Sequence, residues 1–514
     1  MSSSILHLLE QGQSAHQLGQ LAEAEQYYIQ VLQQEPQHFD ALHLIGAIAH
    51  QRGDHETALQ FYGKALQRNP HHAPLLHNIG SCLLRLERLH EALQALEQAQ
   101  RLDPQHVQSW ISSGVVLRQL QDYPAAIKAF ERAMEIQIDA IDAYYERGLC
   151  LQELDLDLDA LLDFDDALHF LKRADKAPAQ CQFARGLSLQ KLGRFEEARS
   201  AYQAAAFEFT LQTKALFNLA ILETTCQHYD AALNCLEDLL FIDAQSLQAH
   251  LQKIQVLKLM GHLDEAVAAI HKAAQFGLES EHAQFLLASL GRSASPHAAP
   301  ADYVRSLFDH YAPHFDQHLT VNLEYRLPSI LRACFQKYLA RSAANFTANS
   351  RMLDLGCGTG LCGAELRDFG ATLIGVDLSP EMLKRAAARN IYDSLVCNDI
   401  VHFLVGEEQV ADLVLLADVL VYMGDLQELL TQCHRVLQSD GFLFFTVELD
   451  PATNSIAQTE GYRLQASQRY AHQESYLRDL AASGAWEVLE MSPHALRREG
   501  QDVIDSLVCV WRKI

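Results

Sequence analysis

The chain has 514 residues, which is too long for a single hydrophobic core, and a prior of roughly 150 residues per domain predicts about three domains. Hydrophobic residues make up 49% and charged residues 20%, as in globular proteins and unlike disordered chains. The formal net charge of −25 argues against nucleic acid as a partner, because proteins that bind a polyanion usually carry a positive surface.

The N-terminal sequence and the cysteines bear on where the protein resides. No apolar run approaches the roughly 20 residues that span a bilayer, and the first residues lack the basic and apolar regions of a signal peptide. The 11 cysteines are irregularly spaced, which favours reduced thiols. Cys357 and Cys362 form a close pair without a second Cys or His pair, so no metal site is expected. We therefore expect a cytoplasmic protein that does not bind membranes.

A period of 34 residues runs through the first part of the chain, and after an insertion of four residues it resumes. Two series of mostly small residues follow it. They are Gly12, Gly46, Gly80, Gly114, Gly148, Gly186, Ala220 and Ile254, and Ala24, Ala58, Ala92, Ala126, Ala160, Ala198, Ala232 and Ala266. Each period predicts two antiparallel helices that cross closely at the small residues. Four positions after the alanine, aromatic residues such as Tyr28 and Phe130 are expected to fill the groove between units.

This pattern resembles the tetratricopeptide repeat. We predict eight repeats from about 5 to 279 and a capping helix at 281–291, so the solenoid covers 1–291. The resemblance implies that the concave face binds a protein or a peptide. A spacer or a dimerisation element is the alternative.

A domain boundary is predicted at 292–300, where the sequence RSASPHAAP is small, polar and aperiodic. From 301 to 514, apolar strand patterns alternate with helical patterns, which predicts a parallel sheet with helices on both faces. The tail predicts a helix at 474–483 and strands at 486–491 and 506–512. The predicted fold class is therefore an all-α solenoid followed by a Rossmann-like α/β domain.

The sequence RMLDLGCGTGL at 351–361 predicts a strand, a glycine-rich turn and a helix that begins near Leu361. Glycines there allow positive φ and let a cofactor approach the backbone closely. The glycines alone are also typical of nicotinamide and flavin sites. Asp354 favours another ligand, because a carboxylate disfavours a pyrophosphate at this position. S-adenosylmethionine has no phosphate and carries a sulfonium and an ammonium group.

Three more strands are predicted to end at the same edge of the sheet, where open α/β folds bind their ligands. The second strand, 372–377, ends in Asp377, which could accept hydrogen bonds from both ribose hydroxyls. Leu378 follows, and Met382 could lie against the adenine. The third strand is followed by Asp399, whose carboxylate could accept a hydrogen bond from the adenine amine. The fourth strand is predicted to end at the same edge, near Ala417. The contacts predicted after these two strands are Asn398, Asp399, Ile400 and Ala417.

Together these motifs resemble class I S-adenosylmethionine-dependent methyltransferases over 301–514, with a mostly parallel seven-stranded sheet. A narrower resemblance, to predicted bacterial methyltransferases preceded by tetratricopeptide repeats, rests on DYVRSLFDHYAPHFDQHL, LGCGTGLCG, ADVLVYMGD and RYAHQESYLRDL. The resemblance implies S-adenosyl-L-methionine as the cofactor, with Asp377 on the ribose and Asp399 on the adenine edge. The residues implied on its methionine half are Asp354, Gly356, Cys357, Gly358, Thr359 and Gly360.

The methyl acceptor is expected between the segments 302–318, 418–425 and 449–473. The first resembles the aromatic lid of small-molecule methyltransferases, and Tyr311 in it is expected to contact the cofactor. Tyr422 and His472 are the candidates for a general base or for orienting the acceptor. The alternatives are a core position for Tyr422 and a helix-capping role for His472. Arg463 and Arg469 could hold an acceptor carboxylate or could be solvated loop residues.

The acceptor class is narrowed by two missing motifs. The sequence LADVLVY stands where an Asn-Pro-Pro-Tyr segment would indicate amide or adenine amino methylation, and the paired-glutamate loop of protein arginine methyltransferases is absent. An oxygen, carboxylate or other nitrogen acceptor stays open. The alternative function is an interaction scaffold whose domain binds the cofactor without catalysis. The intact set of acidic and glycine residues favours an enzyme.

Overall fold

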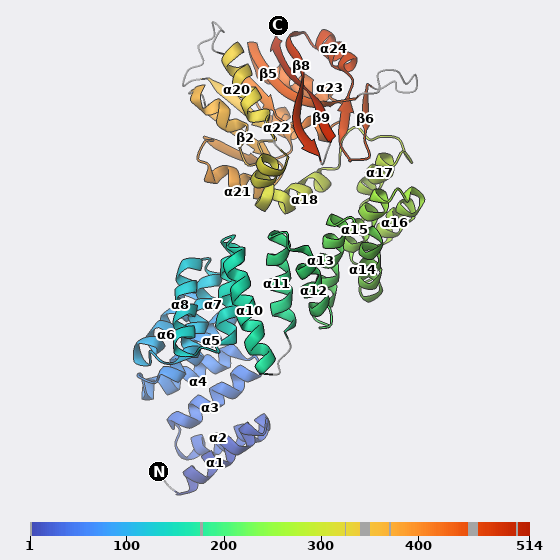
Figure 1. Ribbon diagram of the computed structural model, residues 1–514. Coiled ribbons are helices and arrows are strands. Elements are labelled where there is room, and N and C mark those ends of the chain that lie inside the picture. Colours follow the sequence, from blue (N-terminus) through green and yellow to red (C-terminus); the bar gives the residue numbers. More distant parts are fainter. Residues whose placement is uncertain are drawn as a thin grey trace. The chain divides into compact units, whose positions relative to one another are not determined.

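The computed structural model describes residues 3–174, 178–323, 325–339, 350–369, 372–450, 461–499 and 502–514. The chain divides into two compact units, Met1–Met260 and Gly261–Ile514. The first is helical and the second is built around a sheet (Figure 1). Among the described residues, no helix is long and apolar enough to cross a membrane. The predicted fold class, a helical solenoid followed by a Rossmann-like domain, is confirmed.

The first unit is a succession of paired helices, in which each odd-numbered helix packs on the next helix in the chain. The pairs are α1 (Ser3–Gln17) and α2 (Leu21–Gln34), α3 (Phe39–Gln51) and α4 (His55–Arg68), α5 (Ala73–Arg85) and α6 (Leu89–Leu102), α7 (Val107–Gln119) and α8 (Tyr123–Ile136), α9 (Ile141–Glu153) and α10 (Asp157–Arg173), α11 (Ala179–Lys191) and α12 (Phe195–Ala205), and α13 (Gln212–Thr225) and α14 (Tyr229–Ile242), with α15 (Leu247–Leu259) after them. The helices follow the 34-residue period of the sequence.

The small residues of the period lie where two helices of a pair cross. A Cβ atom at Gly46 would come within 2.5 Å of the Tyr62 ring, and one at Gly114 within 2.5 Å of the Phe130 ring. Ala58, which precedes Tyr62 by one helical turn, is fully buried. Because the aromatic ring occupies the space that a larger residue would need, this close packing fixes glycine in the first helix of the pair.

The second unit begins with helices and continues into a sheet whose strands alternate with short helices. The helical elements are α16 (Leu263–Gln275), α17 (Ser280–Ser289), α18 (Ala301–Tyr311), η1 (Ala312–His314), α19 (Phe315–Gln317), η2 (His318–Asn322), α20 (Leu327–Tyr338), η3 (Gly363–Phe369), α21 (Pro380–Ala388), α22 (Ile400–Gly406), η4 (Leu420–Tyr422), α23 (Gln427–Val436) and α24 (Glu474–Ser483). The strands are β1 (Arg351–Leu355), β2 (Thr372–Asp377), β3 (Ser394–Cys397), β4 (Ala411–Leu416), β5 (Leu437–Leu449), β6 (Tyr462–Leu464), β7 (Tyr470–His472), β8 (Trp486–Glu499) and β9 (Asp502–Lys513).

The strands form one mixed sheet. Its parallel part runs in the order β3-β2-β1-β4-β5, and β9 pairs antiparallel with both β5 and β8. One hydrophobic core lies under α22, α23 and α24, and a second lies under α20 and η3, so helices cover both faces. The carboxyl ends of β1, β2, β3 and β4 meet at one edge, which is where the predicted cofactor residues lie.

The structure differs from the prediction in two places. Within the described residues the sheet has nine strands rather than the predicted seven, because β6 and β7 form a hairpin in the stretch 449–473. β7 pairs parallel with the end of β5 beyond the last residue that pairs with β4. Residues 451–460 of that stretch lie outside the described residues. The helix expected near Leu361 begins at Gly363 and is a 3-10 helix.

The predicted boundary segment 292–300 is hydrogen-bonded to the second unit. The Ala299 amide donates to the Tyr422 carbonyl at 2.9 Å, and the His297 carbonyl accepts from the Gly424 amide at 2.7 Å. The Tyr470 hydroxyl donates to the Pro296 carbonyl at 2.7 Å. We call residues 296–299 the strap. The compact unit that contains it begins at Gly261, so the boundary at 292–300 stays a proposal based on sequence.

Candidate cofactor and acceptor site

A loop of three glycines follows β1 and has a backbone that side chains would not tolerate. Gly356, Gly358 and Gly360 have φ angles of 72°, 53° and 88°. A Cβ atom at Gly356 would lie 2.3 Å from Val419, and one at Gly360 would lie 3.0 Å from the ring of Tyr392. The loop therefore needs glycine for both its conformation and its packing, and it presents bare backbone at the end of β1. Cys357 and Thr359 lie between the glycines and are buried.

Asp354 lies beneath this loop and is 1% exposed. Its Oδ2 accepts a hydrogen bond of 2.6 Å from the Tyr392 hydroxyl. Burial raises the pKa of Asp354 to about 7, while the bond from Tyr392 acts in the opposite direction. A cation bound nearby would favour the charged carboxylate, because an opposite charge offsets the cost of burying it. Tyr392 was not predicted from the sequence, since nothing local in the sequence links it to Asp354.

Asp377, at the end of β2, connects the second strand to the glycine loop. Its Oδ2 accepts from the Gly358 amide at 2.8 Å, and its Oδ1 accepts from the Ser379 amide at 2.8 Å. Burial raises the pKa of this carboxyl, and the backbone hydrogen bonds act against that shift. A carboxylate offers about four acceptor positions. With the backbone amides of Ser379, Gly358 and Leu378 as donors, at least one position is left for a ribose hydroxyl. The geometry is compatible with the predicted ribose contact.

The remaining predicted cofactor residues lie along the same edge. Leu378 follows β2, and Met382 is fully buried one turn into α21. Asp399 is exposed, and its Oδ1 caps α22 by accepting from the His402 amide at 2.9 Å. Asn398 and Ile400 flank this cap, and Ala417 directly follows β4. The second oxygen of Asp399 is therefore the atom available for the predicted adenine contact.

Two acidic residues that were not predicted from the sequence join the segment 301–317 to the glycine loop and to the residues after β2. Asp309 Oδ1 accepts from the Ser379 hydroxyl at 2.5 Å. Asp316 accepts from the Thr359 hydroxyl and from Arg389. The ring of Phe315 would lie 3.8 Å from a Cβ atom at Gly358. We call 301–317 the lid. Asp309 lies in α18 and Asp316 in α19, with the 3-10 helix η1 between them, so no regular helical spacing in the sequence indicated this pair.

Tyr311 lies on the lid but contacts its own segment. Its hydroxyl is hydrogen-bonded to His318 Nδ1, and its ring meets that of Phe315 edge to face at 5.4 Å. Contact between Tyr311 and the cofactor stays a prediction. Tyr303, which was expected in the same lid, instead hydrogen-bonds Gln468 at 2.8 Å and lies against the Phe285 ring of α17.

Tyr422 lies among charged and aromatic groups on the acceptor side. The guanidinium of Arg469 lies over its ring, 5.6 Å from the centroid, and the ring of Phe308 from the lid meets it edge to face at 5.5 Å. Arg469 Nε also pairs with Glu448 at 2.7 Å, and its Nη2 pairs with Asp418 at 3.2 Å. Asp418 has a positive φ of 58°, an uncommon conformation outside glycine. Tyr422 therefore joins the lid to an ion-paired cluster at the end of β4.

The two arginines of the stretch 449–473 are ion-paired with carboxylates of the protein. Arg463 Nη2 lies 2.8 Å from Asp450 Oδ1, and Asp450 is buried. Arg469 holds Glu448, which is 4% exposed. Arg463 lies in β6 and its side chain is 39% exposed, whereas Arg469 lies in the loop between β6 and β7 and is 18% exposed. Each arginine neutralises a buried carboxylate, and a role in holding an acceptor carboxylate stays a prediction.

His472 is a buried residue of β7, and its contacts are not those of the predicted helix cap. It is fully buried in β7, its Nε2 donates to the Gly424 carbonyl at 3.0 Å, and its ring stacks on Tyr476. Burial lowers its pKa to about 4. A general base must reach its substrate, which the burial of His472 does not favour, and the base role stays a prediction. The capping role is wrong, because Gln473 is the N-cap of α24 and has no side-chain capping bond.

The chain matches two kinds of known family. Residues 353–445 match a methyltransferase domain. Residues 9–73, 49–111, 107–137 and 183–246 match tetratricopeptide repeats. The chain thus carries multiple tetratricopeptide repeats and a methyltransferase domain after them.

The curated relatives include several O-methyltransferases. A malonyl-[acyl-carrier protein] O-methyltransferase of Hamiltonella defensa is 31% identical over 109 residues, which are 21% of this chain and 42% of the relative. One of Enterobacter lignolyticus is 26% identical over 203 residues, 40% of this chain and 66% of the relative. The mitochondrial ubiquinone biosynthesis O-methyltransferase of Bos taurus is 27% identical over 130 residues, 24% and 35% of the two chains. The chain spans less than two thirds of the length of each.

Among solved structures, similar chains are tetratricopeptide repeat proteins. One is YrrB, described as a tetratricopeptide repeat protein with an unusual peptide-binding site; it is 22% identical, with a TM-score of 0.32, over 37% of this chain and 95% of that chain. Another, from Parabacteroides merdae, is 18% identical, with a TM-score of 0.36, over 48% of this chain and 95% of that one.

Proposed function

We propose that this protein is a class I methyltransferase that uses S-adenosyl-L-methionine to methylate an oxygen acceptor. The observation that carries the proposal is the loop Gly356–Gly360, whose bare backbone lies at the carboxyl end of β1 beside Asp377 at the end of β2. The O-methyltransferase relatives support an oxygen acceptor, either a carboxylate or a hydroxyl.

The residues at this edge fit S-adenosylmethionine better than a dinucleotide. The glycine loop leaves no space for side chains at Gly356 and Gly360. A positively charged ligand would favour the charged form of the buried Asp354 carboxyl beneath the loop. Asp377 would hold the ribose hydroxyls, and Asp399 would hold the adenine amine. When bound, the cofactor supplies an electrophilic methyl group on a sulfonium.

The protein groups act mainly by positioning. Asp316 holds the lid to the glycine loop and Asp309 holds it to Ser379 after β2, and this closure would exclude water from the transfer. Phe308 and Tyr422 form an aromatic wall beside the cluster of Arg469, Asp418 and Glu448. An acceptor carboxylate is already a nucleophile and needs only orientation, which can supply much of the rate enhancement. This mechanism agrees with the burial of His472.

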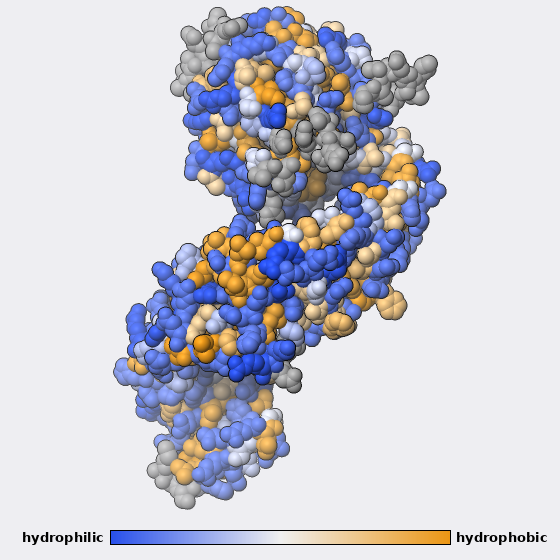
Figure 2. Space-filling model, in the orientation of Figure 1, coloured by the Kyte–Doolittle hydropathy of each residue, from blue (hydrophilic) through white to orange (hydrophobic). Residues whose placement is uncertain are grey.

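We further propose that the repeats recruit a protein partner or a protein-borne acceptor. The visible face of the molecule is mostly hydrophilic with apolar areas between (Figure 2). In the first unit, large apolar side chains are exposed around the start of α10, among them Leu156, Leu158 and Leu162 at 45%, 65% and 65% exposure. Exposed leucines beside one another are a common feature of protein-binding surfaces. The relatives named for malonyl-[acyl-carrier protein] act on an acceptor that a protein carries.

The cofactor assignment is tested with the substitution Asp377→Ala. The change removes the acceptor of two ribose hydroxyls and one anchor of the glycine loop, so affinity for S-adenosylhomocysteine should fall by on the order of 1–3 kcal/mol. Titration calorimetry measures the loss, and Asp479→Ala, an exposed position on α24, is the matched control. Unchanged affinity in Asp377→Ala would refute the ribose assignment.

Catalysis is tested with methyl-labelled cofactor and cell extract. Transfer of label to a product in an acid-stable or base-labile form supports an enzyme. The transfer should be lost with Asp377→Ala. Cofactor binding without any transfer of label would favour the alternative, an interaction scaffold with a non-catalytic domain.

A further inference from the structure

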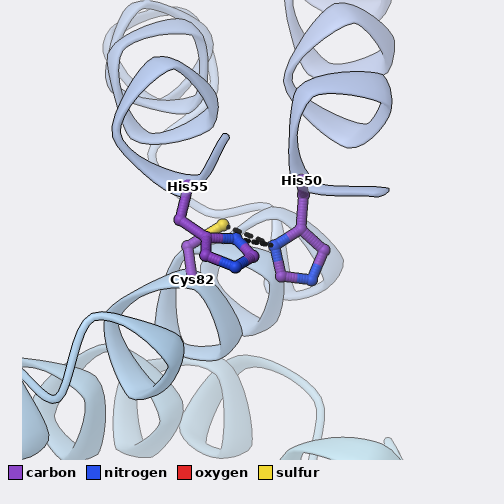
Figure 3. A group of neighbouring side chains, drawn as sticks. All are labelled: His50, His55 and Cys82. Atoms are coloured by element: carbon purple, nitrogen blue, oxygen red, sulfur yellow. Dashed lines mark hydrogen bonds between the residues drawn. The ribbon is translucent and has the colours of Figure 1, made fainter. Parts of the chain in front are cut away.

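Two histidines and a cysteine converge in the second and third repeats (Figure 3). His50 is near the end of α3, His55 begins α4, and Cys82 is in α5. His50 Nδ1 lies 2.9 Å from Cys82 Sγ and 3.2 Å from His55 Nδ1. All three atoms lie within 4.8 Å of one another, and this is the one such group of His, Cys, Asp or Glu in the described part of the chain.

Hydrogen bonds alone satisfy this arrangement poorly. A neutral imidazole nitrogen carries either one proton or one lone pair. His50 Nδ1 faces both Cys82 Sγ and His55 Nδ1, so it can serve one of these two neighbours at a time. A metal ion between the three atoms would use all three lone pairs together.

The distances suit a small tetrahedral ion. With Zn–N of about 2.0–2.1 Å and Zn–S of about 2.3 Å, tetrahedral ligands lie about 3.3 Å apart for two nitrogens and about 3.6 Å apart for nitrogen and sulfur. The separations found here are 3.2 Å and 2.9 Å. These two separations would each change by well under 1 Å to admit zinc, and the third pair, His55 and Cys82, lies within 4.8 Å. Rotation about χ angles can provide such movements.

The burial of the three residues matches a site with an entry path. Cys82 is fully buried, whereas both histidines are partly exposed. The Cys82 proton would leave when the metal binds, since the ion supplies the charge that makes a buried thiolate stable. On the side where the histidines are exposed, water would occupy the fourth coordination position of the metal.

We propose that a zinc ion binds His50 Nδ1, His55 Nδ1 and Cys82 Sγ, with water as the fourth ligand, and fastens the second repeat to the third. Imidazole and thiolate together select zinc over hard cations such as magnesium. This replaces the expectation of no metal site, which considered only neighbours in sequence. Cys82 and His50 are 32 residues apart and meet because adjacent repeats stack.

The sequence contains an internal comparison two repeats further along. Cys150 is buried at the position equivalent to Cys82, but Arg118 and Tyr123 stand where His50 and His55 stand in the earlier repeats. Arg118 there pairs with Glu146 at 2.8 Å. A guanidinium and a phenol do not provide the two imidazole ligands. The substitution Cys150→Ser is therefore a matched control for Cys82→Ser.

The test uses the full chain, stripped with a chelator and then titrated with Zn²⁺ in competition with a chromophoric chelator. The wild type and Cys150→Ser should bind one tight equivalent, and Co²⁺ in its place should give a thiolate charge-transfer band. Substitution of a residue that supports a metal ligand typically lowers metal affinity by about 10–100-fold, and loss of a ligand itself should cost more. Cys82→Ser and His55→Gln should therefore weaken zinc binding by about 100-fold or more. Zinc should raise the melting temperature of the wild type and of Cys150→Ser only.

His55→Gln keeps the test valid if Cys82→Ser folds poorly, because His55 is partly exposed. The proposal is overturned if the wild type takes up no tight equivalent. It is equally overturned if both ligand variants bind zinc like the wild type, which would assign the metal to others among the 25 histidines and 11 cysteines.

Discussion

At the scale of single residues, buried titratable groups in the second unit serve two different purposes. Asp354 and Asp377 lie under and beside the glycine loop, where burial raises the pKa of each carboxyl and a cationic ligand would compensate. His472 is equally buried but lies away from the loop and holds the Gly424 carbonyl. A shifted pKa thus marks a functional candidate only when the group also faces a place for a ligand.

His472 should make the second unit sensitive to acid. Its pKa of about 4 in the folded protein is below the value of about 6.5 expected in the unfolded chain. Above pH 6.5 both states are neutral and stability is complete; as the pH falls toward 4, only the unfolded state takes up the proton. The free energy of unfolding should therefore fall over that window, by about 3 kcal/mol at most. Denaturant unfolding at several pH values, compared with His472→Gln, measures the difference.

Tryptophan fluorescence can follow the unfolding of the second unit, because Trp486 and Trp511 lie in its core. Trp110 of the first unit can be replaced by Phe to remove its signal. Equal pH dependence in the wild type and in His472→Gln would show that His472 does not carry the effect. His434, whose pKa is also lowered by burial, is present in both proteins and cancels in the comparison.

The residues that sequence reasoning found are those whose reason is local. The glycines of 356–360 are dictated by positive φ within one turn, and Asp377 ends a strand at a fixed distance along the fold. His472 and Tyr392 were misread or missed because their partners, Gly424 and Asp354, are 48 and 38 residues away in sequence. Only the folded chain shows which buried polar groups pair.

At the scale of elements, the strap and α17 tie the end of the helical region to the acceptor side of the sheet. Phe285 of α17 is fully buried in a cluster with Tyr462 and Tyr470 from the β6–β7 hairpin. The His297 carbonyl accepts from two amides of the loop after η4, those of Gly424 and Asp425. The loop that carries Tyr422 is therefore held from outside the sheet.

Removing these elements should destabilise the methyltransferase domain. A fragment of residues 301–514 lacks α17 and the strap, exposes Tyr470 and leaves the amides of Gly424 and Asp425 to water. We expect it to be less stable than the fragment 261–514 by on the order of 3 kcal/mol, from one large apolar side chain and a few hydrogen bonds. Denaturant unfolding of the two fragments measures this. Equal stability would mean that the strap contributes nothing to the domain.

The elements show where sequence patterns carry information and where they do not. The helix predicted at 474–483 matches α24 at both ends, because its apolar period and its terminal glycine are clear. The hairpin of β6 and β7 was missed, since its strands have three residues each, which is too short for an alternating pattern to stand out. The strap was read as a linker because its contacts use mainly backbone atoms, which leave no trace in residue type.

At the scale of the whole molecule, the net charge of −25 bears on the choice of partner. A strongly acidic protein repels polyanions and attracts basic or neutral surfaces, and this long-range attraction weakens as salt screens it. The solenoid adds a large surface beyond the methyltransferase domain, and we propose that this surface recruits the partner. If the acceptor is carried by a protein, recruitment should act on encounter and affinity and should leave the chemical step unchanged.

The full chain and the fragment 261–514 should therefore differ in KM for the acceptor and not in kcat. With a protein-borne acceptor, the full chain should show a lower KM than the fragment 261–514, while kcat and the affinity for S-adenosylhomocysteine stay the same, because binding energy from a remote surface raises local concentration without changing the transfer. Raising the ionic strength from about 0.05 to 0.3 M should raise the KM of the full chain more than that of the fragment if the partner is basic. A small-molecule mimic of the acceptor should be methylated equally by both. Equal KM values for the protein acceptor would assign the repeats to spacing or assembly instead.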